Sequence, residues 1–257
     1  MNFLMDRLLN MEKEYVKLFS DAIEDDRTIR YIDPLLPDMY SHNFVFYKPK
    51  QGLVEFIASE LNKAETKSSG FLRIETPYPI DADLLDTFPI KPRICLYDIM
   101  YIETKKFKDL KGNPDCRIAI ADSKETMEDG ILVDIAANHI GMGLEFAKRR
   151  ILRKSQEYMR DDKPIQLFVC YQEDTPIGNI EYMPLNGIVK LEDFDILESY
   201  QRKGFGTAVL KYLLEKANVN KIEHAYLITD NSDSAKEMYM KCGFEKVGKK
   251  RELLFHY

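Results

Sequence analysis

The chain has 257 residues, 45% of them hydrophobic, so it is long enough for one large core or two smaller ones, and two domains are the better expectation. A formal net charge of −6, with 31% charged residues, argues against a nucleic-acid partner or an anionic membrane surface. No apolar run approaches the roughly 20 residues that span a bilayer, and the first residues show helical periodicity with acids instead of a signal-peptide core. We therefore expect a cytoplasmic protein. The four cysteines are widely spaced and include no CxxC pair, which indicates free thiols and no zinc site.

The first 112 residues predict an α/β domain. A helix is expected over residues 6–23, with Tyr15, Phe19 and Ile23 on one face. The elements expected after it are strands at residues 43–47, 70–76 and 93–103 and a helix at residues 53–64. The segment 105–115 lacks apolar periodicity and contains Gly-Asn-Pro, which favours a domain boundary between residues 112 and 113.

Residues 113–257 predict a second domain that runs from helices through an antiparallel meander into a β-α-β-α-β order. The expected elements are a strand at 116–121, helical segments within 127–159, strands at 165–171, 177–182 and 188–197, a loop and helix at 201–217, a strand at 225–229, a helix at 232–242 and a final pair of strands reaching residue 257. Asn186 and Gly187 supply the positive φ angles of a tight reversal, so the strands on either side of them should pair antiparallel.

A glycine-bearing loop between the strand at 188–197 and the following helix predicts an anion site. It reads Gln201-Arg202-Lys203-Gly204-Phe205-Gly206-Thr207. The unsatisfied N–H groups of a first helical turn point at such a loop, and the helix dipole adds positive potential. Gly204 and Gly206 lack side chains, so an oxygen-rich ligand can approach the backbone closely.

Three nucleotide-binding motifs contain a glycine loop of this kind. A P-loop requires Gly-Lys-Ser/Thr, but here Lys203 precedes Gly204. A dinucleotide fingerprint requires three glycines opening a βαβ unit, and only two are present. The pattern Q-x-x-G-x-G that remains is the pyrophosphate-binding signature of the GNAT acetyltransferase superfamily.

Residues 116–257 resemble that superfamily in two motifs. The segment from Phe194 to Tyr200 leads into the loop as the family's central strand does. A second signature, about 25 residues after the first, consists of Asn231, Ala235, Tyr239, Gly243 and Phe244. The resemblance implies a mixed, mostly antiparallel α/β (α+β) sheet flanked by helices, and an acetyl-CoA-dependent transferase that moves the acetyl group to an amine by direct attack in a ternary complex.

The resemblance also assigns site residues. Backbone amides of residues 201–207 would hold the pyrophosphate, and the strand backbone at Phe194, Asp195 and Ile196 would pair with the pantetheine arm. Asn231 would cap a helix or lie near that arm. Tyr239 would protonate the departing thiolate, whose thiol has a pKa near 8.5, although its helical spacing also fits a core residue.

The general base is not marked by a motif. Some family members carry a glutamate eleven residues before the loop, and Lys190 stands there in this chain. Glu192 and Asp195 are the candidate bases, with Asp193 and Glu181 nearby, although each also fits a solvated strand face. A water chain, or an acceptor that arrives neutral, would serve as well. The missing base favours an alternative, a coenzyme-binding regulatory module without catalysis.

Two further features have alternative interpretations. A basic run, Lys148, Arg149, Arg150, Arg153 and Lys154, would recruit an acidic acceptor, contact nucleic acid or form a solvated helix face, and the acidic overall charge disfavours nucleic acid. The role of the N-terminal domain is open, and one hypothesis is that it is a degenerate copy of the fold. Such a copy would lack the glycine loop, bind no coenzyme, and wall off the acceptor cleft or form a homodimer. No short motif names the acceptor, so small amines, antibiotics, peptide N-termini and lysines stay open.

Overall fold

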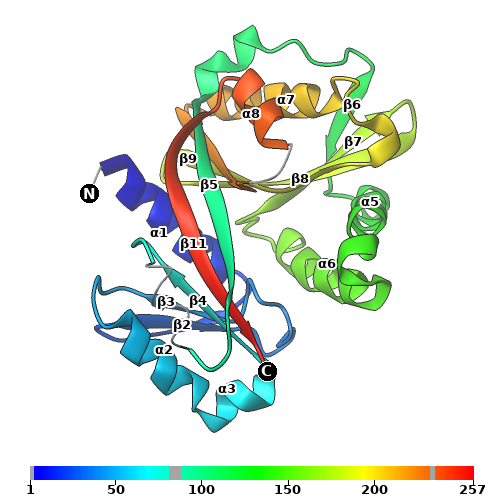
Figure 1. Ribbon diagram of the computed structural model, residues 1–257. Helices are drawn as coiled ribbons and strands as arrows, with labels where there is room; N and C mark the ends of the chain where they lie inside the picture. Colours follow the sequence, from blue (N-terminus) through cyan, green and yellow to red (C-terminus); the bar gives the residue numbers. More distant parts are fainter. Residues whose placement is uncertain (1–2, 81–87, 232–234) are drawn as a thin grey trace. The chain divides into compact units, whose positions relative to one another are not determined.

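The computed structural model describes residues 3–80, 88–231 and 235–257, which fall into two compact units (Figure 1). The first unit comprises residues 1–98 and 248–257, and the second comprises residues 99–247. The strands β5 (Arg93–Glu103) and β11 (Glu245–His256) each run from one unit into the other. The expected boundary between residues 112 and 113 falls within the second unit and stays a prediction.

The first unit is built on a sheet with the order β1-β2-β3-β4-β11. Neighbouring strands are antiparallel except β3 and β4, which are parallel. Helix α1 covers one face with a cluster around Ile29 and Phe44, and α2 covers the other with a cluster around Ile57 and Phe255. The element bounds are α1 Phe3–Lys17, β1 Asp21–Glu24, β2 Thr28–Ile32, β3 Phe44–Tyr47, α2 Leu53–Leu61, α3 Ala64–Ser69 and β4 Phe71–Thr76.

The expected helix over residues 6–23 was wrong at its C-terminal end. Helix α1 stops at Lys17, and the chain from Asp21 pairs with β2 as strand β1. Two contacts turn the chain between these elements: the hydroxyl of Ser20 donates to the carbonyl of His42 at 2.7 Å, and Phe19 stacks on the His42 ring. Ile23 is consequently 62% exposed instead of part of a helical core face. Tertiary contacts outweigh local periodicity here.

The second unit has the strand order β5-β10-β9-β8-β7-β6. Strands β6 to β9 pair antiparallel in succession, and β9 pairs parallel with β10. Helices α5 and α6 lie on one face and α7 and α8 on the other (Figure 1). The bounds are η1 Thr104–Asp109, β6 Cys116–Ile120, α5 Lys124–Met142, α6 Leu144–Tyr158, β7 Gln166–Gln172, β8 Thr175–Leu185, β9 Ile188–Ile196, η2 Glu198–Tyr200, α7 Phe205–Val219, β10 His224–Asp230 and α8 Ala235–Lys241.

This mixed, mostly antiparallel sheet flanked by helices confirms the predicted fold class. Asn186 and Gly187, at φ 50° and 75°, form the tight reversal between β8 and β9. Helix α7 buries the expected stripe, which ends in Leu214 and Ala217. One expectation was wrong, because the final segment is the single strand β11 instead of a pair. No helix in the described ranges is long and apolar enough to cross a membrane.

The two units share an order of elements. Each contains a three-strand antiparallel meander, then a helical crossover, then a strand parallel to the last strand of the meander. In the first unit these elements are β1-β2-β3, α2 with α3, and β4. In the second unit they are β7-β8-β9, α7 and β10. This common order supports the interpretation of the N-terminal part as a degenerate copy, which stays a prediction.

Candidate functional site

Strands β9 and β10 pair over a short stretch and then separate. Their register joins residues 188–191 of β9 to residues 224–227 of β10 and ends at Leu191 and Leu227. On its other edge, β9 stays paired with β8 as far as Ile196. One edge of β9 faces β10 at residues 188–191. On that same edge, residues 193–196 therefore present main-chain N–H and C=O groups with which an extended ligand can pair.

A bulge in β9 lies at the point of separation. Asn179 of β8 faces Asp195 and Glu181 faces Glu192, so two residues of β9, Asp193 and Phe194, oppose the single Ile180. Asp193 has a φ of 45°, in the left-handed region that residues other than glycine rarely adopt. Such an extra residue bends its strand and increases the local twist, which re-aims the chain that follows.

The loop of residues 201–207 connects this strand to α7. Gly204, at φ 82° and ψ 2°, is the N-cap residue of α7, and Arg202 is also left-handed at φ 60°. Asn113 fixes the outer side of the loop: its side-chain amide donates to the carbonyl of Lys203 at 2.9 Å, and its backbone N–H donates to the carbonyl of Gly204 at 3.1 Å. The loop carbonyls are thus engaged on one side.

The backbone amides at the start of α7 lack partners within the helix. The N–H groups of Phe205, Gly206 and Thr207 belong to the first turn of α7 and have no intrahelical acceptor. The side chains of Gln201, Arg202 and Lys203 are exposed, and that of Gln201 donates back to the carbonyl of Ile196 at 2.8 Å. The loop is therefore open at its surface, with two added positive charges, as an anion site requires.

Gly206 allows close packing behind the loop. A Cβ at this position would lie 2.8 Å from the sulfur of Met238 in α8 and 3.6 Å from the ring of Phe194. The absence of a side chain therefore lets the start of α7 approach both α8 and the bulged part of β9. The start of α7, α8 and the bulged part of β9, which carry the sequence motifs, therefore meet at Gly206.

The second motif lies mostly in α8. Tyr239 is 6% exposed and packs edge-on against Phe244 in the core of the unit. The exposed Asn231 accepts a hydrogen bond from Lys236 Nζ at 3.1 Å. The first three residues of the helix expected at 232–242 lie outside the described residues. The roles of Tyr239 and Asn231 toward a coenzyme stay predictions.

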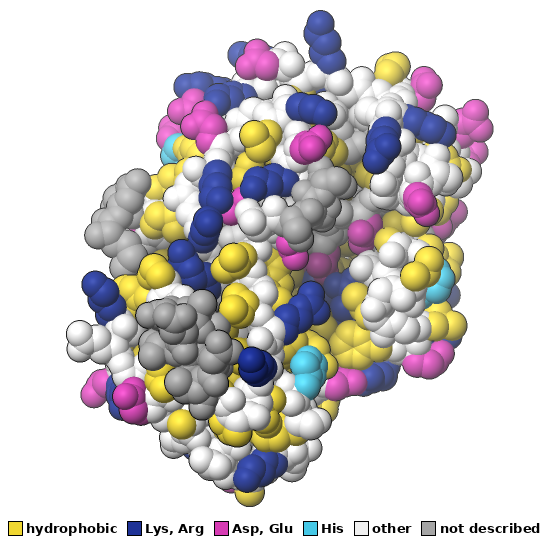
Figure 2. All heavy atoms as spheres, viewed as in Figure 1, with side chains coloured by type: hydrophobic (Ala, Val, Ile, Leu, Met, Phe, Trp, Pro, Cys, Tyr) yellow, Lys and Arg dark blue, Asp and Glu magenta, His cyan; other side chains and the backbone are white. Residues whose placement is uncertain are grey.

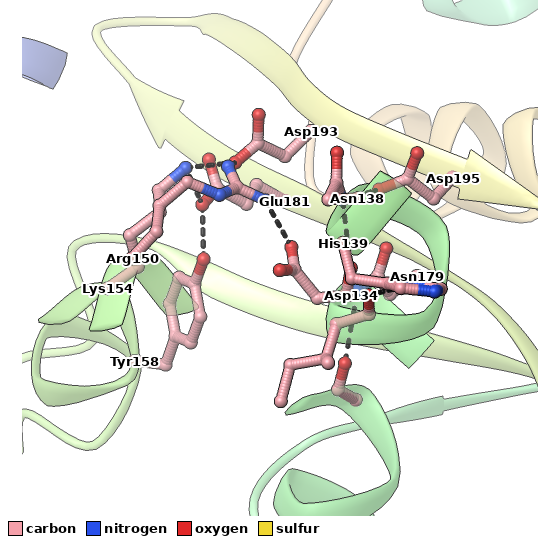
Figure 3. A network of polar contacts seen from close by, with 12 residues as sticks. Asp134, Asn138, His139, Arg150, Lys154, Tyr158, Asn179, Glu181, Asp193 and Asp195 are labelled. Atoms are coloured by element: carbon pink, nitrogen blue, oxygen red, sulfur yellow. Dashed lines mark hydrogen bonds and ion pairs between the residues drawn. The ribbon is translucent and has the colours of Figure 1, made fainter. Parts of the chain in front are cut away.

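The candidate bases differ in their surroundings. Glu192 lies 2.6 Å from Nζ of Lys190, which is 1% exposed. Glu181 is fully buried, contrary to the expectation of a solvated strand face, and contacts Lys154 at 2.6 Å. Asp195 is half-buried, and its Oδ2 accepts from the side-chain amide of Asn138 at 3.0 Å (Figure 3). Glu192 and Glu181 each contact a lysine, whereas Asp195 contacts no cation directly among the described residues.

The pKa of Asp195 is raised above its ordinary value. Burial is the main cause, and the negative charge of Asp193 adds to it, while the hydrogen bond from Asn138 acts in the opposite direction. A carboxylate with a raised pKa is a stronger proton acceptor. The environment of Asp195 therefore suits a general base better than that of Glu192.

The basic run on α6 is not a solvated face throughout. Arg150 and Lys154 are 4% and 2% exposed, and both contact Asp193 (Figure 3). Sequence reasoning missed this arrangement, although a signal was present: both residues lie on the same helical stripe as Ala147, Ile151 and Tyr158, which are buried. Only Lys148 and Arg149 of the run extend toward solvent, together with part of Arg153.

Comparison with known proteins agrees with this geometry. Residues 140–244 match the model of the acetyltransferase (GNAT) family. These residues form a GNAT acetyltransferase domain. The match covers α6 to α8, including the bulge, the loop and the second motif. Enzymes of the GNAT family take an acetyl group from acetyl-CoA.

Similar proteins extend over nearly the whole chain. An uncharacterized N-acetyltransferase, CgeE, of Bacillus subtilis is 29% identical over 96% of both chains. A functionally unknown conserved protein from Staphylococcus epidermidis has a solved structure with a TM-score of 0.82 at 25% identity, covering 96% of this chain and 99% of its own. A GCN5-related N-acetyltransferase from Kribbella flavida shares the fold, with a TM-score of 0.70 at 13% identity and coverage of 97% and 94%.

Proposed function

We propose that this protein is an acetyl-CoA-dependent N-acetyltransferase that transfers the acetyl group to an amine by direct attack in a ternary complex. The observation that carries the proposal is the separation of β9 from β10 beside an open helix N-terminus capped by Gly204. The free edge at residues 193–196 suits the amide groups of a pantetheine arm, and the amides of residues 202–207 suit its diphosphate.

The proton balance assigns two residues. The acceptor amine, with a pKa near 10 when free, loses its proton to the carboxylate of Asp195 and attacks the thioester carbonyl. A C–N bond forms, and the C–S bond breaks as the tetrahedral intermediate collapses. Tyr239 then donates the proton that the leaving thiolate takes up, and the second proton lost by the attacking nitrogen restores the Tyr239 hydroxyl through solvent. Glu192 is the weaker candidate for the base because Lys190 already neutralises it.

Two measurements test this function. Calorimetric titration should show acetyl-CoA binding, and a panel of small amines, amino sugars and peptides should include one that releases free coenzyme thiol in the presence of enzyme. Absence of both binding and thiol release would contradict the proposal.

The regulatory module without catalysis is separated from the enzyme by one substitution. Tyr239→Phe keeps the ring that packs on Phe244 but removes the proton donor. In an enzyme, turnover should fall by about 10² to 10⁴-fold with little change in coenzyme affinity. Wild-type protein that binds coenzyme but turns over no amine would favour the module.

A further inference from the structure

Two cations of α6 converge on the bulge of β9. Nη1 of Arg150 lies 2.7 Å from Oδ2 of Asp193, and Nζ of Lys154 contacts the same oxygen (Figure 3). Although burial acts to raise it, the charges of Lys154 and Arg150 hold the pKa of Asp193 well below its ordinary value. Asp193 is therefore a carboxylate anchored by two buried positive charges.

The same cations also bind the elements on either side. Nη2 of Arg150 lies 2.5 Å from Oδ2 of Asp134 in α5, and Lys154 reaches Glu181 of β8, which also accepts from the hydroxyl of Tyr158. The guanidinium of Arg150 thus spans from α5 to the bulge. These contacts join α5, α6 and β8 to a single residue of β9.

Asp193 is the residue at which β9 departs from regular geometry. Its φ of 45° is unfavourable for a residue with a Cβ, and such conformations persist where the surroundings hold them. The chain after it supplies Phe194 to Ile196, the free edge, and Asp195, the candidate base. A shift at Asp193 would therefore move both features.

We infer that Arg150 and Lys154 are positioning residues for acetyl transfer, because they hold the bulge at Asp193 and with it the strand edge that receives the pantetheine arm. This inference rests on the proposed function. Stability alone is a poor account of the arrangement, since buried ion pairs are often no more stabilising than apolar residues of similar size. Their place at the separation of β9 from β10 gives them a positional role.

The test uses paired substitutions that leave the net charge unchanged. The double variant R150Q/D134N removes a buried cation and anion together, so that Asp193 keeps only Lys154. The matched control is K124Q/E128Q, which removes the exposed ion pair at 3.8 Å on α5, the helix that carries Asp134. For each protein, the dissociation constant of coenzyme A, kcat and KM for acetyl-CoA, and the unfolding midpoint would be measured.

The coenzyme A dissociation constant of R150Q/D134N should rise about tenfold and its kcat/KM for acetyl-CoA should fall by a similar factor, measured well below its unfolding midpoint. The control should match wild type. A folded double variant with wild-type affinity and wild-type kcat/KM, whatever its unfolding midpoint, would overturn the inference and leave the proposed function intact.

The variant Arg150→Lys keeps the test decisive if the double variant fails to fold. It retains the positive charge but loses the guanidinium fork, whose two terminal nitrogens contact Asp193 and Asp134 separately. Coenzyme affinity should fall at least threefold, and wild-type affinity would overturn the inference. Wild-type protein that binds no coenzyme A would instead remove the proposed function, and this inference with it.

Discussion

Asp193 combines an unusual backbone with a charged anchor, and the two contributions can be separated by substitution. Asp193→Gly and Asp193→Ala both remove the carboxylate that Arg150 and Lys154 contact. Each should be destabilised by about 3 to 5 kcal/mol, because two buried cations lose a partner. The alanine variant should be less stable than the glycine variant by about a further 1 kcal/mol, since only glycine adopts a positive φ without cost.

Chemical denaturation of the two Asp193 variants measures this difference directly. Equal stability of the pair, or a more stable alanine variant, would mean that the left-handed backbone is not retained at this position.

In the proposed mechanism, Asn138 influences the pH dependence of acetyl transfer through its hydrogen bond to Asp195. Its hydrogen bond favours the ionised carboxylate and so lowers the pKa of Asp195, against the larger effect of burial. The base must be ionised to act, so the acidic limb of the kcat/KM profile follows this pKa. In Asn138→Leu the limb should move to higher pH, with the activity plateau at alkaline pH retained.

A pH–rate profile of Asn138→Leu against wild type checks this. A limb that stays in place, or one that moves to lower pH, would remove Asp195 from the role of base. The nearby Asp134, whose pKa burial raises to about 6 despite Arg150, is a separate group that the profile of Asp134→Asn would identify.

Residue chemistry was only partly predictable from the sequence. Gly204 and Gly206 were predicted to belong to an anion site, because a ligand can approach the backbone before a helix closely only where side chains are absent. Asp193 and Arg150 were noted in the sequence, but their pairing was not predicted, because it joins residues 43 positions apart and depends on how α6 packs on the sheet. By composition, the basic run of α6 looked like a solvated helix face. Arg150 and Lys154 differ from the rest of the run only in lying on the buried stripe of that helix.

Among the elements, the loop before α7 carries the most specific prediction. Gly204→Ala and Gly70→Ala place the same methyl group at nearly the same φ, 82° and 79°, one at the N-terminus of α7 and one after α3 in the first unit. Both should lose about 1 to 2 kcal/mol of stability. Only Gly204→Ala should weaken acetyl-CoA binding, by about tenfold, because it shifts the backbone amides of residues 202–207, the proposed diphosphate site.

Calorimetry on the two glycine variants separates backbone strain from ligand contact. Equal affinity in both variants would show that the loop does not hold the coenzyme.

Elements with strong local signals were predicted well, and those fixed by distant contacts were not. The Asn186-Gly187 reversal and the stripe of α7 follow from turn chemistry and periodicity. The end of α1 at Lys17 does not, because contacts to His42, more than 20 residues later, turn the chain there. The bulge in β9 has no local sequence signature either.

At the scale of the whole molecule, side chains of the first unit pack against the glycine before α2. Gly52 caps α2 at φ 79°, as Gly204 caps α7. A Cβ at Gly52 would lie 3.1 Å from the hydroxyl of Tyr47 and 3.2 Å from the guanidinium of Arg27, whereas a Cβ at Gly204 would lie 3.3 Å from the backbone nitrogen of Asn113. Arg27 donates to the hydroxyl of Tyr47, which in turn donates to the carbonyl of Gln51. The first unit thus repeats the strand and helix order without the open glycine loop.

The full chain should therefore bind one coenzyme per molecule. Calorimetric titration with acetyl-CoA should give a stoichiometry near one, and Gly204→Ala should weaken that single event without revealing a second. A stoichiometry near two would contradict the interpretation of the first unit as a copy without coenzyme binding.

The most direct test of the account is backbone amide hydrogen exchange with and without acetyl-CoA. Saturating acetyl-CoA should slow exchange in two segments, residues 193–196 of β9 and residues 202–207 before and within the first turn of α7, while the equivalent segment before α2 stays unchanged. Unaltered exchange in both segments of a protein that demonstrably binds acetyl-CoA would place the coenzyme elsewhere and contradict the account.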